Sequence, residues 1–226
     1  MTTTLLQLRT DARQLADREN SQFVTDAELT NYVNSAIAEL QDLLIASYGN
    51  DYYVSSTDIT TVNGTDTYAL PASFYKLLGV DVKFNTSNWF TIRPFNFNER
   101  NRNADIVSWG QLTGPTIRYR LQGSNIKFSP TPSGAYPVRL WFVPLAVKLV
   151  ADGDIFDDLN QYSDFIIYDA AMKMLMKEEA DVSVLMQQKK ECEKRIMEMS
   201  QNRDVGQPES VSDIYAENDE FYWTRS

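Results

Sequence analysis

Few side chains in this sequence are suited to catalysis. The chain contains no histidine, which excludes a nucleophile activated by histidine and a histidine-ligated metal site. A single cysteine, Cys192, excludes an internal disulfide, and its place on the apolar repeat of a charged helix (KKECEKR) predicts a small buried side chain. The glycine-rich loops that bind phosphate groups are also missing. We therefore predict a protein that is not an enzyme and that uses no metal and no cofactor.

The carboxylates offer two further kinds of site. The stretch ADGDIFDDLN fits a calcium-binding EF-hand loop poorly, because Phe156 occupies a ligand position and no glutamate stands at the twelfth position. We favour a role in a loop and at a helix start for its four acids, Asp152, Asp154, Asp157 and Asp158. A carboxylate pair that cleaves glycosidic bonds stays open, because any two acids could converge in the fold.

The best-marked element is a helix over residues 25–49. Thr25 and Glu28 have the spacing of a capping box, and Gly49 stands where a left-handed C-cap is expected. Apolar residues recur at three- and four-residue spacing between these ends, which predicts one buried face. At 1.5 Å per residue this helix is about 35 Å long, so it must pack against other long elements.

Those elements lie on both sides of a β-rich section. Helical periodicity marks residues 2–20, 157–177 and 182–203, with Asp181 as the cap of the last helix. Between the helical parts, turn signals at Asn63-Gly64 and at residues 123–125 predict two hairpins of an antiparallel sheet or small barrel.

The predicted fold is therefore α+β. It is a four-helix bundle, with two N-terminal and two C-terminal helices, that is interrupted by an antiparallel β insertion and followed by an extended C-terminal arm. The domain boundaries that we predict are a helical bundle domain over residues 1–50 and 151–203, a β insertion domain over 51–150 and an arm over 204–226.

The charge of the chain limits its partners. With 31 acidic and 21 basic residues the net charge is −10, which argues against nucleic-acid binding through a broad basic surface. An acidic protein can still line a passage for DNA, because it repels phosphate. No apolar run approaches the roughly 20 residues needed to cross a membrane. The first residues lack the pattern of a secretory signal, so we expect the chain to be intracellular when it is made.

The segment 204–226 combines acids with large apolar side chains. It has six acidic residues and one basic residue, a net charge of −5. A segment that is only solvated would have few aromatics. We therefore favour an arm that docks on a partner or a neighbouring subunit over a disordered tail, with five candidate anchors, Ile214, Tyr215, Phe221, Tyr222 and Trp223.

The β-rich section contains a second group of aromatics: Trp89, Phe90, Phe95, Phe97 and Trp109. Several asparagines lie among them (Asn85, Asn88, Asn96, Asn98 and Asn101), so the group could form a sugar-binding face. We favour the alternative that these aromatics fill the core of the sheet and cover its edges.

Four stretches together resemble the head-to-tail adaptor (connector) proteins of tailed bacteriophages. They are LLQLRTDARQLADRENSQFVTDAELTNYVNSAIAELQDLLIASYGNDYY, TDTYALPASFYKLLGVDVK, DLNQYSDFIIYDAAMKMLMKEEADVSVLMQQKKECEKRIMEM and RDVGQPESVSDI. The resemblance implies a structural virion protein of the neck, assembled as a ring of commonly twelve copies beneath the portal. DNA would pass through the lumen without specific binding, and a tail or nozzle protein would bind the opposite side.

The resemblance also implies roles for particular residues. The arm 204–226, with its five anchors, would bind the portal protein. A closed ring needs contacts between different faces of adjacent copies. The polar side of the helix over residues 25–49, which looks uncommitted in the sequence, would meet the next copy through Asn31, Asn34, Ser35, Glu39 and Asp42. Two alternatives stay open, a tail-completion or tail-tube protein and a glycan-binding virion protein that uses the aromatic β section.

Overall fold

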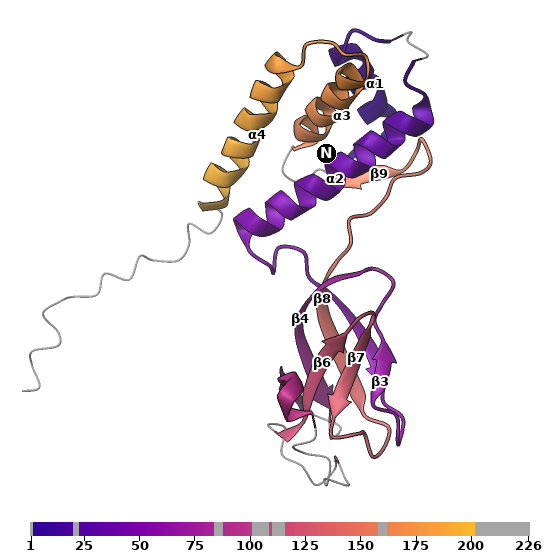
Figure 1. Cartoon of the computed structure of the whole chain (residues 1–226), viewed down its shortest axis with the longest axis vertical. Helices are drawn as coiled ribbons and strands as arrows, with labels where there is room; N and C mark the ends of the chain where they lie inside the picture. Colours follow the sequence, from indigo (N-terminus) through magenta and orange to yellow (C-terminus); the bar gives the residue numbers. More distant parts are fainter. Residues whose placement is uncertain are drawn as a thin grey trace, which may run out of the picture.

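Two separate hydrophobic cores organise the chain. The computed structural model describes residues 2–19, 23–83, 88–100, 109, 116–157 and 162–201. One core lies among the helices and is closed by residues from both ends of the chain, whereas the other lies inside a curled sheet. The two cores share no residue. Figure 1 shows the helices at one end of the molecule and the sheet at the other. The predicted α+β class is confirmed.

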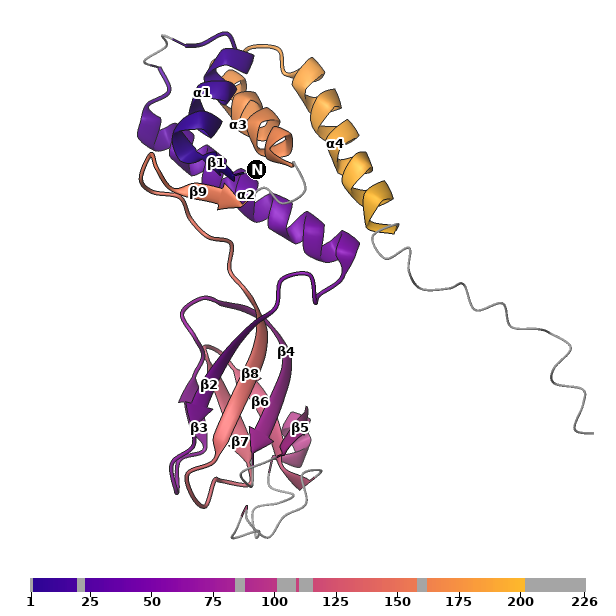
Figure 2. The same cartoon turned by 180° about the vertical axis from the view of Figure 1, so that it is seen from behind.

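The described residues form four α-helices. They are α1 (Leu5–Leu15), α2 (Asp26–Tyr48), α3 (Ser163–Lys177) and α4 (Ser183–Gln201). Helix α3 contacts each of the other three, and both views of the molecule show it between α1 and α4 (Figures 1 and 2). The helices share one core, but the regular four-helix bundle that we predicted is not confirmed.

Helix α2 has the ends that the sequence predicts. The Thr25 hydroxyl accepts a hydrogen bond from the Glu28 N–H at 3.3 Å, and the Glu28 carboxylate accepts one from the Thr25 N–H at 3.0 Å. Gly49 follows the last turn with φ +102° and ψ 163°, a backbone conformation that favours glycine, and its N–H donates to the carbonyl of Ile45. Six residues of the predicted apolar face are buried: Leu29, Val33, Ala36, Ile37, Leu40 and Leu44. Tyr32 and Leu43, which the same spacing includes, are only partly buried, and Ile45 is buried although the spacing does not include it.

A short strand pair delays both predicted helix starts: Thr4, within the predicted range 2–20, caps α1, whereas the predicted start of the third helix at Asp157 is wrong. Strand β1 (Thr2–Thr4) pairs antiparallel with β9 (Ile155–Asp157), so α1 begins only after Thr4 and α3 begins only at Ser163. The ladder continues as a hydrogen bond from the Leu5 N–H to the carbonyl of Asp154. Pairing between distant segments thus prevailed over the local helix signal of Asp157, and Asp158 lies outside the described residues.

The sheet contains seven strands within the described residues, in the order β2-β8-β4-β5-β6-β7-β3. Their bounds are β2 Ser55–Thr60, β3 Thr67–Ala69, β4 Phe74–Lys83, β5 Trp89–Pro94, β6 Arg118–Gln122, β7 Asn125–Ser129 and β8 Pro137–Pro144. The two edge strands are consecutive in the chain, because only residues 61–66 join β2 to β3. The sheet therefore curls until its edges approach each other (Figure 2).

One of the two predicted hairpins forms. Strands β6 and β7 pair around Gly123, whose φ is +57°. The hairpin predicted at Asn63-Gly64 is wrong: β2 pairs with β8 and β3 with β7. The turn itself is present, with Gly64 at φ +80°, but its two strands go to opposite edges of the sheet. The sheet is also not fully antiparallel, because β5 and β6 are parallel.

A cluster of charges links three helices. The Asp169 carboxylate on α3 is 1% exposed and accepts a 2.8 Å hydrogen bond from the Lys189 ammonium on α4. Lys189 also donates to Glu39 on α2 at 2.7 Å, and Lys173 pairs with the second oxygen of Asp169. Burial alone would lower the pKa of Lys189, but its hydrogen bonds to Asp169 and Glu39 outweigh burial and raise the pKa. The cluster fixes α4 against α2 and α3.

We predict that Asp169→Asn lowers the free energy of unfolding by about 3 kcal/mol, because the Lys189 ammonium loses its buried counter-charge. Urea denaturation followed by circular dichroism measures this change. The control is Lys194→Ala, which removes an exposed pair with Glu198 on α4 and should cost less than about 0.5 kcal/mol. Equal denaturation midpoints for Asp169→Asn and the unchanged protein would contradict the prediction.

Candidate assembly surfaces

The polar side of α2 holds the segment that returns from the sheet to the helices. The Asn34 amide donates to the Leu149 carbonyl at 2.9 Å and accepts from the Leu149 N–H at 2.8 Å. The Leu149 side chain is buried in the helical core, so its backbone groups need partners inside the protein. Two turns of α2 closer to the sheet, the Gln41 amide donates to the Pro144 carbonyl at 2.7 Å. Two amides of α2 thus replace the ladder that a neighbouring strand would supply.

The same helix also contacts the sheet directly. The Tyr75 hydroxyl on β4 donates to the Asp42 carboxylate at 2.8 Å, and the Lys76 ammonium donates to Asn50 at 2.6 Å. These contacts lie at the C-terminal end of α2, which is the end nearer the sheet in Figure 2. The position of the sheet relative to the helices is therefore set by α2.

These contacts overturn one premise about the predicted subunit interface. We expected the polar side of α2 to be uncommitted, but four of its five named residues have partners within the chain. Asn34 binds Leu149, Ser35 accepts from Lys173, Glu39 accepts from Lys189 and Asp42 accepts from Tyr75. Asn31 is exposed. The sequence hid these partners because they lie more than 30 residues away, and the assignment of these five residues to a subunit interface remains a prediction.

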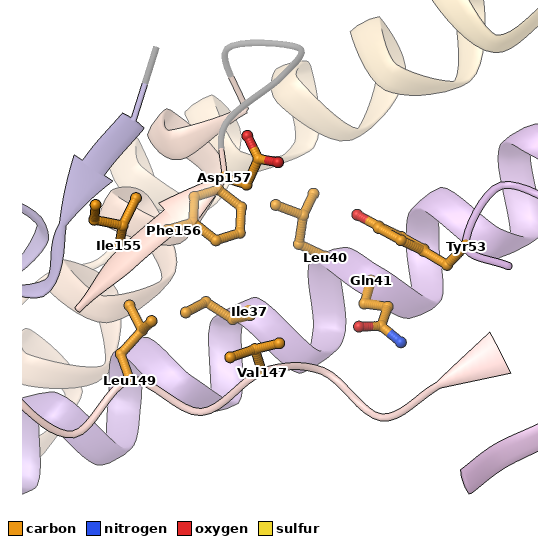
Figure 3. A pocket seen from close by; sticks show the side chains of 9 residues that line it. All are labelled: Ile37, Leu40, Gln41, Tyr53, Val147, Leu149, Ile155, Phe156 and Asp157. Carbon is orange, nitrogen blue, oxygen red and sulfur yellow. The ribbon is translucent and has the colours of Figure 1, made fainter. Parts of the chain in front are cut away.

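A small pocket lies beside the returning segment (Figure 3). It is lined by α2, by Tyr53, by Val147 and Leu149, and by β9, and it encloses about 170 Å³. Sites for small molecules typically enclose about 300–1,000 Å³. Burial raises the pKa of the Tyr53 hydroxyl to about 12, so this group stays neutral at ordinary pH. The pocket is the size of one large side chain and is too small for a typical cofactor.

Two acids of the aspartate-rich stretch stabilise the loop in which they lie. Asp152 pairs with Arg9 at 2.6 Å, and Asp154 accepts hydrogen bonds from the N–H groups of Val150 and Ala151. Those two bonds lower the pKa of the Asp154 carboxyl. No group of three or more potential metal ligands occurs in the described parts of the chain. The predicted loop role is confirmed for these two residues.

Cys192 is half-buried and packs against the helical core, so the predicted buried side chain is confirmed only in part. Burial still raises the pKa of its thiol, which keeps the side chain in its less reactive form. None of the described helices is long and apolar enough to cross a membrane.

The aromatic side chains of the sheet do not gather into one exposed face. Trp109 and Phe95 are buried, as the core interpretation predicts, and the Trp109 ring, which belongs to the core of the sheet, stacks on Tyr136. Trp89 is half-buried, with Arg139 4.6 Å above its ring. Phe90 and Phe97 are exposed. Asn85 and Asn101 lie outside the described residues. This arrangement does not favour a sugar-binding face.

Arginines cluster at the β5–β6 junction, and the sequence analysis did not predict this cluster. Arg93 and Arg118 are register partners in the parallel pair, and Arg100 and Arg120 both lie over the ring of Phe97. A local count could have revealed it, because residues 51–150 carry ten basic and six acidic residues in a chain of net charge −10. We call Arg93, Arg100, Arg118, Arg120 and Phe97 the arginine patch.

The five predicted anchors of the arm, Ile214, Tyr215, Phe221, Tyr222 and Trp223, lie outside the described residues. The structure describes the chain up to Gln201, the last residue of α4. In both views this end of α4 is the one nearer the sheet (Figures 1 and 2).

We predict that Asn34→Ala lowers the free energy of unfolding by about 2 kcal/mol, because it leaves two backbone groups of Leu149 without partners. The matched control is Asn31→Ala, an exposed asparagine one turn away, which should change stability by less than about 0.5 kcal/mol. Denaturation by urea compares the two variants. A loss that is equal in both would show that the Asn34 contact does not hold the returning segment.

Comparison with known proteins agrees with these features. The family model described as SU10 adaptor protein matches residues 3–212, which include both helical parts, the sheet and the start of the arm. No curated protein matches the chain. The match confirms the resemblance to the head-to-tail adaptors of bacteriophages that the four stretches indicate. This chain therefore belongs to the SU10 adaptor protein family.

Proposed function

We propose that the protein is a head-to-tail adaptor that forms a ring beneath the portal and links the capsid vertex to the tail. The observation that carries this proposal is the family match over residues 3–212. In this role the protein is a structural component of the virion neck and not an enzyme. The portal protein binds one side of the ring, and a tail or nozzle protein binds the other.

The contacts of α2 with the sheet and the returning segment support the role of a connector. An adaptor holds two partners at a defined distance and orientation. The helices and the sheet, which form its two ends, must therefore keep a defined position relative to each other. The amide contacts of Asn34 and Gln41 and the Asp42–Tyr75 bond hold them in that position. The buried pair of Asp169 and Lys189 holds α4, from which the arm continues.

The net charge of −10 supports the passage of DNA through the ring. A lumen lined by acids repels phosphate, so DNA slides past without specific binding. The helical parts and the arm carry this negative charge, because residues 51–150 are net positive. In the proposed ring the helices, rather than the sheet, line the lumen.

The helices also offer two different faces for contact between copies. Met186 and Met197 are exposed on one face of α4, and Leu6 is exposed on α1. Helices α1 and α4 lie on opposite sides of α3 (Figures 1 and 2). Contacts between opposite faces of successive copies close a ring, which we propose has twelve copies. The α4 face of one copy then packs on the α1 face of the next.

For the ring contact, we expect that Met186→Glu combined with Met197→Glu prevents ring formation, because it places charges in an apolar interface. Native mass spectrometry reads the oligomeric state, and circular dichroism verifies that the monomer is folded. The control is Val62→Glu, an equally exposed apolar residue beyond the end of β2. Rings of normal abundance in the double variant would exclude the α4 face.

For the portal contact, we expect that a chain ending at Arg203 no longer binds purified portal rings, because it lacks the five anchors of the arm. Co-sedimentation measures binding, and circular dichroism shows whether the shortened chain keeps its helices. Full binding by the shortened chain would place the portal contact elsewhere. If the full-length chain itself ignores portal rings, a tail-completion or tail-tube role replaces the adaptor role.

A further inference from the structure

Four arginines at the β5–β6 junction have no acidic partner among the described residues. In the part of the chain that the structure describes, no carboxylate lies within ion-pairing distance of Arg93, Arg100, Arg118 or Arg120. Other arginines of the same protein are paired: Arg9 with Asp152, Arg13 with Asp26, Arg18 with Glu178 and Arg139 with Asp58. In an acidic protein, where carboxylates are plentiful, this concentration of unpaired positive charge marks the patch as a surface for an external anion.

The patch is also held in place. The parallel pairing of β5 and β6 sets Arg93 directly opposite Arg118. The guanidinium groups of Arg100 and Arg120 lie 4.8 Å and 5.5 Å from the centre of the Phe97 ring, and Arg120 also donates to the Phe95 carbonyl. Phe97 itself is 51% exposed. The surface thus offers positioned guanidinium groups around an exposed aromatic ring.

This chemistry matches an acidic peptide that also contains aromatic side chains. Guanidinium groups bind carboxylates through paired hydrogen bonds and stack on aromatic rings. Phe97 offers the apolar contact that a peptide aromatic needs. Nucleic acid fits less well, because the patch is small and the negative charge of the whole chain repels phosphate at a distance.

The chain itself contains such a peptide. Residues 204–226 carry a net charge of −5 together with five large apolar anchors. The described structure ends at Gln201, and the 25 residues that follow can span about 80 Å when extended. The end of α4 lies on the same side of the molecule as β5, as Figure 2 shows. The length of the segment and the position of the α4 end therefore allow the segment to reach the arginine patch of its own copy, and its negative charge favours binding there.

We propose that residues 204–226 dock on the arginine patch of the same chain before assembly. Their carboxylates pair with the free guanidinium groups, and an aromatic side chain of the segment packs on Phe97. The docked state keeps the large apolar side chains of the segment away from other copies until a partner binds them. Docking of the segment can be measured on the isolated chain, so its absence would not contradict the adaptor role.

Double electron–electron resonance, which measures the distance between two spin labels, tests the proposal on the full-length chain. One spin label is placed at Ala216→Cys within the segment and the other at Asn98→Cys beside Phe97, in a Cys192→Ser background. An excess of unlabelled chain ensures that only labels on the same copy contribute. We expect a narrow distribution of short distances. It should be lost at about 1 M salt, where the Debye length falls to about 3 Å.

Two variants separate the patch from a general effect of charge. Replacing Arg93, Arg100, Arg118 and Arg120 by glutamine should convert the narrow distribution into a broad one. The control, Arg139→Gln, also removes a positive charge from the sheet, but from an arginine that is already paired, and it should keep the narrow distribution. A broad distribution in the unchanged chain, or a narrow one in the fourfold variant, would overturn the proposal.

The same fourfold variant tests the alternative partner. A fluorescent single-stranded oligothymidylate is titrated with the full-length chain, and its anisotropy is followed. We expect no binding. Binding that disappears in the fourfold variant, together with a broad distance distribution, would overturn the proposal in favour of a nucleic-acid surface.

Discussion

The pairing of the Asn34 amide with the backbone of Leu149 is the contact on which the arrangement of the molecule depends. The chain leaves the helices after α2, forms the sheet and must return to supply α3 and α4. Leu149 enters the helical core on this return, and its backbone would be buried without partners if Asn34 did not bind both groups. A single side chain of α2 thus allows one segment to join two separate cores. Gln41 and Asp42 extend the same contact toward the sheet.

The other side of α2 has a different task. Its apolar residues fill the helical core. On the polar side, Glu39 also contributes to the charge cluster around Asp169 and Lys189. Removing one partner of a buried ion pair costs more than the intact pair contributes to stability, because it leaves an uncompensated charge in the core. Helix α2 therefore determines both the packing of the helices and the placement of the sheet.

What the sequence predicted correctly was local. The capping box of α2, its buried face and the turn at Gly123 each depend on residues a few positions apart. The errors came from contacts between distant residues. Strand β9 replaced the expected start of α3 because it pairs with β1. The two strands around Asn63-Gly64 do not pair with each other, because β2 pairs with β8 and β3 pairs with β7. A single sequence carries no signal for such pairings, so topology could not be derived from it.

For the candidate surfaces too, local features were predicted and contacts between distant residues were not. The polar residues of α2 were found from their spacing, but their partners Leu149, Lys173, Lys189 and Tyr75 all come from distant parts of the chain. The arginine patch joins residues from β5, from the short helix η1 (Phe97–Glu99) and its C-cap Arg100, and from β6, so no local motif marks it. Only the excess of basic residues over 51–150 could have pointed to this section.

Electron cryomicroscopy of the assembled neck tests the adaptor role most directly. The role predicts a closed ring of this protein between the portal and the tail, with the helices around the DNA passage, the sheet away from it and residues 204–226 on the portal. A map in which this protein is absent from the ring, or in which the portal is contacted by the sheet and not by the C-terminal segment, would contradict it.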